Sequence, residues 1–210
     1  MSSLSNRVKA FKRAEADFPT KFGHFRILGF EGNQRDSETG RTEAAIAVVM
    51  GDIHSAPPLV RVHSQCLTGD VFHSLRCDCR MQLELALKMI AEAGAGILLY
   101  EQKEGRGIGL IAKLKAYELQ DQGLDTVEAN ERLGFKADHR GFELPAAVLR
   151  AMEIKEVRLI SNNPQKVKAL ESAGVRVVER VPCEPNAGSH SAAYLKTKRE
   201  KLGHLISSDE

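Results

Sequence analysis

The sequence predicts a fold of the α+β or mixed α/β class, in which a β-rich first part packs with an alternating α/β second part as one unit. Before residue 80, short runs of apolar and polar residues are typical of strands, and helical spacing is rare. After residue 80, segments with helical spacing alternate with short apolar runs. The 210 residues contain no internal repeat and are enough for one large domain or two small ones.

The β-rich part contains three predicted strands. The segments 23–32 and 42–50 have strand-like composition, and the polar stretch GNQRDSETGR between them predicts a hairpin loop. A third run of apolar and polar residues, LVRVH, covers 59–63.

The α/β part begins with a helix predicted at 82–93, where leucine and isoleucine recur at helical spacing and Gly94 can cap the C-terminus. The run GILLYE predicts a buried strand, and a glycine-rich turn follows it. A second helix is predicted at 110–120 and ends at Gly123.

Asp125 and Glu128 have the spacing of a capping box, which predicts another short helix. The remaining elements are predicted as helices at 144–152, 166–173 and 192–205 and as strands at 157–161 and 175–181.

The composition is that of an ordinary globular protein, with 42% hydrophobic and 28% charged residues. A net charge of +2 argues against a nucleic-acid coat protein, so a basic site would be a local cluster suited to a small anion. The N-terminus lacks the apolar run of a signal peptide, and no segment approaches the roughly 18 apolar residues of a membrane span. With four cysteines we expect a reducing cytoplasm rather than a disulfide framework.

Cys66, Cys77 and Cys79 form the pattern C-x10-C-x-C, which predicts a zinc site because thiolates are soft ligands. Three protein ligands leave the fourth tetrahedral position open, as in catalytic zinc sites that activate water. Arg76 and Arg80 flank the site and favour ionised thiols.

Two alternatives to this site stay open. The three cysteines can be buried core residues, as free cysteine often is, although charged residues alternate with them. Cys183, in the loop-like segment PCEPNAGSH, can complete a four-sulfur structural zinc site or an iron–sulfur cluster.

Two turns between a strand and a helix are candidate phosphate sites, since helix N-termini attract anions. The first contains Gly105 and Arg106, and its plain alternative is a tight turn with solvated charges. The second runs from Ser161 to Lys166, and its plain alternative is an N-cap with Pro164 in the first turn.

Three further residues are candidates for chemistry. Asp138 and Arg140 place a carboxylate two residues from a guanidinium, a pair that is usually a surface salt bridge. Tyr117 lies on the apolar stripe of the helix predicted at 110–120, where core packing is its default role.

Taken together, the segments RVHSQCLTGDVFHSLRCDCRMQLELAL, LLYEQKEGRGIGLIAKLKAYELQDQGLDTVEAN, LGFKADHR and SNNPQKV closely resemble GTP cyclohydrolase II. The likeness is dense from residue 60 to residue 182. It implies a hydrolase acting on cyclic amidine bonds in the first step of riboflavin synthesis. Such an enzyme removes pyrophosphate from GTP and formate from the guanine ring, which leaves a diaminopyrimidinone ribosylamine 5′-phosphate.

The resemblance also implies roles for individual residues. Cys66, Cys77 and Cys79 match the zinc ligands of the family, one ion per chain. Arg140 matches the proposed nucleophile at the α-phosphorus, and Asp138 matches the proposed proton acceptor. Tyr117 matches the tyrosine of the ring-opening stage. The implied GTP contacts are Arg61, Val62, His63, Ser64, Gln65, Gln82, Glu104, Gly105, Arg106, Thr126, Ser161 and Lys166.

The family likeness further implies Mg²⁺ on the triphosphate, a homodimer, and neither nucleic acid nor membrane as a partner. It predicts an extension at 1–20 and a catalytic domain at 21–206, the form without a fused dihydroxybutanone phosphate synthase domain. This sequence departs from the family pattern at Gln65, where glutamate is common, at Ser161 and at Arg80. A paralogue that hydrolyses GTP only in part, and a zinc-stabilised nucleotide-binding regulator without catalysis, are the alternative functions.

Overall fold

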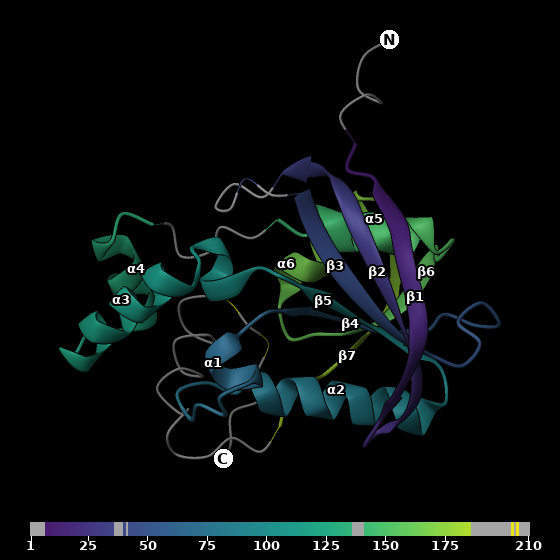
Figure 1. The fold of residues 1–210 in the computed structure, drawn as a ribbon, viewed down its shortest axis with the longest axis horizontal. Helices are drawn as coiled ribbons and strands as arrows, with labels where there is room; N and C mark the ends of the chain where they lie inside the picture. The colour runs from purple at the N-terminus through teal and green to yellow at the C-terminus, as the bar shows by residue number, and fades with distance from the viewer. Residues whose placement is uncertain are drawn as a thin grey trace, which may run out of the picture.

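The protein is built around one seven-stranded mixed sheet with the strand order β1-β2-β3-β5-β4-β6-β7 (Figure 1). The structure, a computed structural model, describes residues 7–35, 40, 42–135, 141–185, 203 and 205. The same sheet runs through the β-rich part and the alternating part of the chain, which confirms the predicted mixed α/β class.

The first half of the sheet is antiparallel. β1 (Ala10–Thr20), β2 (Gly23–Arg35) and β3 (Thr42–Met50) pair in sequence order. The strands predicted at 23–32 and 42–50 are thus confirmed. β1 was not predicted, because an edge strand with mostly exposed and charged side chains lacks the apolar alternation that identifies a strand. It lies within the segment 1–20 that the sequence set apart as an extension.

The second half of the sheet is parallel. β5 (Gly96–Glu101) pairs antiparallel with β3 and parallel with β4 (Leu59–Ser64). β6 (Glu156–Ile160) and β7 (Arg176–Val181) extend the sheet beyond β4, also in parallel. β4 and β5 are buried along nearly their whole length, since helices cover both faces of this half.

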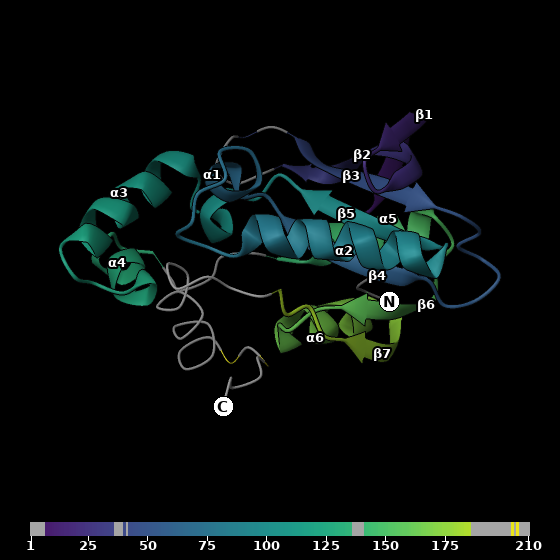
Figure 2. The ribbon, with the colours of Figure 1, turned by 90° about the horizontal axis from the view of Figure 1, so that it is seen from below.

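Helices cover the two faces of the sheet (Figures 1 and 2). α2 (Cys79–Ala93) lies along one face, and α5 (Glu143–Ala151) and α6 (Pro164–Ser172) lie on the opposite one. Each face has its own apolar core. The core under α2 contains Phe25, Val48, Leu59, Ala86, Ile90, Leu98, Ile160 and Cys183.

Two helices stand out from the sheet beyond the end of β5 (Figures 1 and 2). α3 (Leu110–Asp121) and α4 (Thr126–Arg132) pack on one another, and the predicted capping box opens α4. The turn η2 (Glu104–Gly107), after β5, leads to α3, whereas the short helix α1 (Leu67–Asp70), after β4, precedes α2.

The predicted boundaries in the α/β part differ from the observed ones by a few residues. α2 begins at Cys79 rather than at residue 82, because the polar residues of its first turn hide the start of the apolar stripe. The predicted cap at Gly94 is confirmed by its left-handed φ of 71°. The helix predicted at 192–205 lies outside the described residues, apart from positions 203 and 205.

The topology creates a crevice at the carboxyl ends of the parallel strands. The chain leaves β4, crosses through α2 to β5 on one side, and later returns to β6 on the other side of β4. Ligands of open α/β sheets bind where the strand order reverses in this way. Within the described residues, no helix has the length and apolar composition of a membrane span.

Candidate active site

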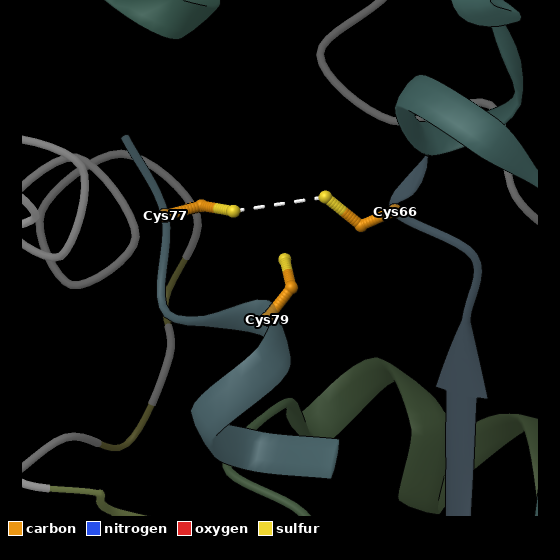
Figure 3. A group of neighbouring side chains, drawn as sticks. All are labelled: Cys66, Cys77 and Cys79. Carbon is orange, nitrogen blue, oxygen red and sulfur yellow. Dashed lines mark hydrogen bonds between the residues drawn. The ribbon is translucent and has the colours of Figure 1, made fainter. Parts of the chain in front are cut away.

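Three cysteine side chains that line this crevice point toward one another (Figure 3). Cys66 follows β4, Cys77 lies in the loop before α2, and Cys79 is the first residue of α2. Their sulfur atoms all lie within 4.8 Å of one another, and the sulfurs of Cys66 and Cys77 are 3.6 Å apart. The cluster predicted from the C-x10-C-x-C pattern is therefore present, and it can hold a metal ion.

The turn at α1 is shaped around the sulfur atoms. A Cβ atom at Gly69 would lie 3.0 Å from the sulfur of Cys77 and 3.1 Å from that of Cys66, so only glycine leaves them this room. The Asp70 carboxylate accepts hydrogen bonds from the Cys66 backbone N–H at 3.0 Å and from the Tyr100 hydroxyl at 2.9 Å. Asp70 therefore fixes the start of the turn to the end of β5.

The three thiols have different pKa values because their sulfur atoms lie close together. The pKa of the Cys66 thiol lies far below its ordinary value, because Cys77 and Cys79 donate hydrogen bonds to its sulfur. Donation to Cys66 raises the pKa of Cys77 to about 11, and the pKa of Cys79 is also raised, by donation to both neighbours. One thiolate is thus held by two thiols. A soft divalent cation would allow all three to ionise, so this donor set fits zinc.

Cys183 is not part of the cluster. It is buried in the core under α2, where its sulfur lies 3.8 Å from the Gln82 carbonyl oxygen. Among the described residues, the group that can hold a metal contains only the three predicted cysteines. The packing therefore argues against a four-sulfur site.

The cysteines border a cavity of about 310 Å³ at the carboxyl ends of β4, β5 and β6. Most of the predicted site residues line it: Arg61, His63, Ser64, Gln65, Cys66, Cys77, Cys79, Gln82, Glu104, Gly105, Arg106, Tyr117, Thr126, Ser161 and Lys166. The side chain of Val62 instead packs in the core on the α5 face of the sheet. Asp138 and Arg140 lie outside the described residues.

Buried Arg61 supplies positive charge next to α2. Its guanidinium donates to the Ile160 carbonyl oxygen at 3.1 Å and to the Gln82 side-chain oxygen at 2.6 Å. Gln82 in turn donates to the Asp78 carboxylate at 2.5 Å, which connects Arg61 to the residue between two cysteines. The Nε atom of Arg61 is buried and has no hydrogen-bond partner among the described residues. An unpaired buried donor requires an explanation, and a bound ligand, ion or water molecule would supply one.

Buried Lys166 supplies a second cation, at the start of α6. Its ammonium donates to the Val62 carbonyl oxygen at 2.7 Å, so the backbone at Val62 contributes to the site although its side chain does not. Asn163 caps this helix and Pro164 occupies its first turn, as the plain alternative predicted. Lys166 and Ser161 nevertheless line the cavity, so the cap and an anion site are compatible here.

The glycine turn after β5 adopts an unusual backbone. Gly105 and Arg106 both have left-handed φ angles, 58° and 63°. For arginine this conformation is uncommon, and such outliers concentrate at functional sites. A Cβ atom at Gly105 would lie 3.1 Å from the Cβ of Lys113, so this glycine also permits a close approach of α3.

Lys113 was missed by the sequence analysis. Its ammonium contacts the Glu104 carboxylate at 2.7 Å, the Thr68 hydroxyl at 2.9 Å and the Cys66 sulfur at 3.2 Å. A lysine on a helix normally indicates a solvated face. The available signal was its spacing of four residues from Tyr117, which puts both on one face of α3.

Tyr117 lines the cavity instead of packing in a core. Its hydroxyl lies 3.2 Å from the Thr68 hydroxyl, and the Arg76 guanidinium lies over its ring at 4.8 Å. Burial raises the pKa of Tyr117, so the phenol stays protonated at neutral pH. Core packing, its default role in the sequence, is thus replaced by a position beside the cysteines.

Fold and site together define a mixed α/β enzyme with a three-cysteine cluster that can hold a metal ion and a cationic cavity at the ends of its parallel strands. The sequence model of the GTP cyclohydrolase II family matches residues 12–182. GTP cyclohydrolase-2 of Histophilus somni (strain 2336) is 51% identical over 194 residues, 92% of this chain and 87% of that protein. The chain belongs to the GTP cyclohydrolase II family.

A second relative, GTP cyclohydrolase-2 of Buchnera aphidicola subsp. Acyrthosiphon pisum (strain APS), is 52% identical over 194 residues, 92% of this chain and 97% of that protein. A solved structure of a two-domain 3,4-dihydroxy-2-butanone 4-phosphate synthase from A. baumannii is more distant. It matches 84% of this chain and 41% of that chain at 17% identity, with a TM-score of 0.45.

Proposed function

We propose that the protein hydrolyses GTP to formate, pyrophosphate and a diaminopyrimidinone ribosylamine 5′-phosphate, as the first step of riboflavin biosynthesis. The observation on which this proposal depends is that one cavity joins three convergent cysteine sulfurs to buried cations, in a chain of this family. The thiolates suit a hydrolytic metal ion, and the cations suit the phosphates of a nucleotide.

Cys66, Cys77 and Cys79 are the residues that would hold zinc. When bound, zinc supplies Lewis-acid chemistry that lowers the pKa of water to about 7. The protein's part is to offer three ligands and a polar cavity on their open side. Lys113 and Tyr117 line the same cavity. The three cysteines therefore do not lie in the apolar surroundings in which free cysteines are usually buried.

Arg61 and Lys166 are proposed to bind the triphosphate, together with Arg106 from the glycine turn. Arg61 and Lys166 are buried and oriented by backbone carbonyls, so they would bind phosphate without further ordering. Mg²⁺ is expected on the triphosphate, since it neutralises charge as pyrophosphate leaves. The other proposed GTP contacts are the backbone of Val62 and the side chains of His63, Ser64, Gln65, Gln82, Glu104, Thr126 and Ser161, with Gly105 in the turn.

Tyr117 is proposed to act at the ring-opening stage. Its protonated hydroxyl can donate a hydrogen bond to the guanine base or orient a water next to the cysteines. Asp138 and Arg140 are proposed, on the family resemblance, as proton acceptor and as the group that acts at the α-phosphorus.

The test is incubation of the protein with GTP and Mg²⁺, with products identified by mass, in the presence and absence of a zinc chelator. The proposal expects formate and pyrophosphate in equal amounts, and loss of formate with the chelator. Pyrophosphate without formate would instead indicate the paralogue that hydrolyses GTP in part. Binding of GTP without any product would indicate a nucleotide-binding regulator.

A homodimer is part of the proposal. Phe72 and Ile111 are 71% and 67% exposed, and Val71, Leu75 and Leu114 are also exposed, so the loop after α1 and the start of α3 present apolar surface. Exposed apolar side chains of this kind often mark protein–protein contacts. Sedimentation equilibrium measures the mass of the protein in solution. A monomer mass at micromolar protein concentration would contradict the proposed dimer.

A further inference from the structure

The side chain of Lys113 connects two parts of the site that the sequence treats separately. Its ammonium has three hydrogens and three acceptors, which are the Glu104 carboxylate, the Thr68 hydroxyl and the Cys66 sulfur. The side chain is nearly buried, and the left-handed turn at Gly105 gives its stem room to pass. This geometry holds the ammonium in one place.

The acceptors of Lys113 are themselves anchored. Glu104 accepts hydrogen bonds from the backbone N–H groups of Leu67 at 2.7 Å and of Gly105 at 3.0 Å. It thereby ties the turn after β4 to the turn after β5. Thr68 contacts the Tyr117 hydroxyl at 3.2 Å, so a chain of polar contacts runs from the Cys66 sulfur through Lys113 and Thr68 to Tyr117.

The charge of Lys113 suits a loaded metal site. Three thiolates around a divalent ion leave one net negative charge, and Lys113 places a cation 3.2 Å from one of the sulfurs. Partners that hydrogen-bond to metal ligands orient those ligands and tune the metal. Lys113 makes this contact to Cys66 from a helix outside the segment that contains the cysteines.

We propose that Lys113 is a positioning residue that fixes the Cys66 thiolate for metal binding and, through Thr68, sets the Tyr117 hydroxyl against the metal site. This inference rests on the proposed function for its effect on catalysis, but not for its effect on metal affinity. Lys113 acts through Cys66 and Tyr117, so its loss weakens metal binding and the formate-releasing step more than the release of pyrophosphate.

The first test compares Lys113→Met with Lys115→Met, an exposed lysine on the same helix. Zinc affinity is measured by chelator competition, and formate and pyrophosphate are measured in one reaction. Lys113→Met is expected to bind zinc about 10- to 100-fold more weakly and to release less formate per pyrophosphate, whereas Lys115→Met matches the wild type. Wild-type zinc affinity together with equal amounts of both products in Lys113→Met would overturn the proposal.

The second test uses Thr68→Val, which keeps the shape of the side chain and removes the hydroxyl between Lys113 and Tyr117. It is expected to weaken zinc binding less than Lys113→Met does, because the Lys113 ammonium keeps its contacts with Glu104 and Cys66, and to release less formate per pyrophosphate. A wild-type ratio of formate to pyrophosphate would overturn the link between Lys113 and Tyr117. If circular dichroism shows that Lys113→Met does not fold, this ratio in Thr68→Val decides whether the link exists. Absence of formate from the wild type would refute the proposed function alone, because zinc affinity is measured without turnover.

Discussion

The two sides of the cavity are held in different ways. The cationic side, formed by Arg61, Ser161 and Lys166, is fixed by the sheet, since both cations donate to backbone carbonyl oxygens at the ends of β4 and β6. The sulfur side consists of Cys66, Cys77, Cys79, Lys113 and Tyr117. Its contacts run mainly from side chain to side chain, and the neighbouring sulfur of Cys66 raises the pKa of the Cys77 and Cys79 thiols.

This difference indicates that the two sides contribute separately. A cationic side built on strand ends is ready for an anion whether or not metal is present. The sulfur side is built from residues of loops and of α3, and its proposed role depends on a metal ion. Substitutions on the sulfur side should therefore change zinc binding and formate release, whereas substitutions on the cationic side should change the affinity for GTP.

The largest effect is expected for Cys66→Ser on the sulfur side. A serine hydroxyl is a poor replacement for a thiolate ligand, so zinc is lost and formate release falls by about 10³-fold or more, given that a catalytic metal contributes several kcal/mol. The fold remains, because the apolar cores lie on the faces of the sheet and not at the cluster. Metal content, formate assay and circular dichroism measure these outcomes.

Cys183→Ala is the matched control for Cys66→Ser, since Cys183 packs in the core under α2. It should keep zinc and the ratio of formate to pyrophosphate. Normal formate release by Cys66→Ser would contradict the assignment of the metal site.

A smaller effect is expected for Lys166→Met on the cationic side. A hydrogen bond to a charged group contributes about 1.5–3 kcal/mol, so the KM for GTP should rise by about 10- to 100-fold while zinc content and the product ratio stay unchanged. Lys168→Met, an exposed lysine on α6, is the control and should leave KM unaffected. A change in zinc affinity in Lys166→Met would show that the two sides are not separate.

The features that depend on side chains within one short segment were predicted from the sequence. The strand at 42–50 has the bounds of β3, the capping box at Asp125 is formed, and the spacing of Cys66, Cys77 and Cys79 gave the cluster. In each case, side chains close in sequence determine the outcome through periodicity, capping or ligand chemistry.

The parts that depend on tertiary contact were not predicted. Lys113 has the sequence context of a solvated lysine, and only the packing of α3 against the turns after β4 and β5 brings it to the sulfur of Cys66. The exposed strand β1 has no apolar face of its own and is recognised through its pairing with β2. Tyr117 was expected in a core because an apolar stripe does not reveal that α3 stands away from the sheet.

An effect of about tenfold is expected for Gly69→Ala on the sulfur side. Its methyl group would lie 3.0 Å and 3.1 Å from two of the sulfurs, so the ligands must shift and zinc binds about tenfold more weakly. Gly29→Ala is the control, because its methyl group would meet only the Cβ of Ala14, at an ordinary distance of 4.0 Å. Chelator competition measures both, and equal zinc affinity in the two variants would contradict the tight fit at Gly69.

The smallest effect concerns His63, which lies between the two sides and contacts the Asp70 carboxylate at 3.2 Å. Burial lowers the pKa of His63 below its ordinary 6.5 in the folded protein. As the pH falls below about 6.5, His63 therefore takes up a proton in the unfolded chain before it does so in the folded protein. The part of the unfolding free energy that this difference contributes at neutral pH is lost as the pH falls toward the pKa of the folded protein.

His63→Gln should remove this loss. Urea denaturation between about pH 7.5 and pH 5 should show that the unfolding free energy of the wild type falls more steeply than that of the variant, by at most about 1.4 kcal/mol per pH unit for one proton. Repeating the series at two zinc concentrations separates this slope from the release of zinc in acid, which affects both proteins. Parallel curves at both zinc concentrations would mean that His63 takes up its proton at the same pH in the folded and the unfolded protein, and that the buried ends of β4 tolerate a further cation next to Arg61.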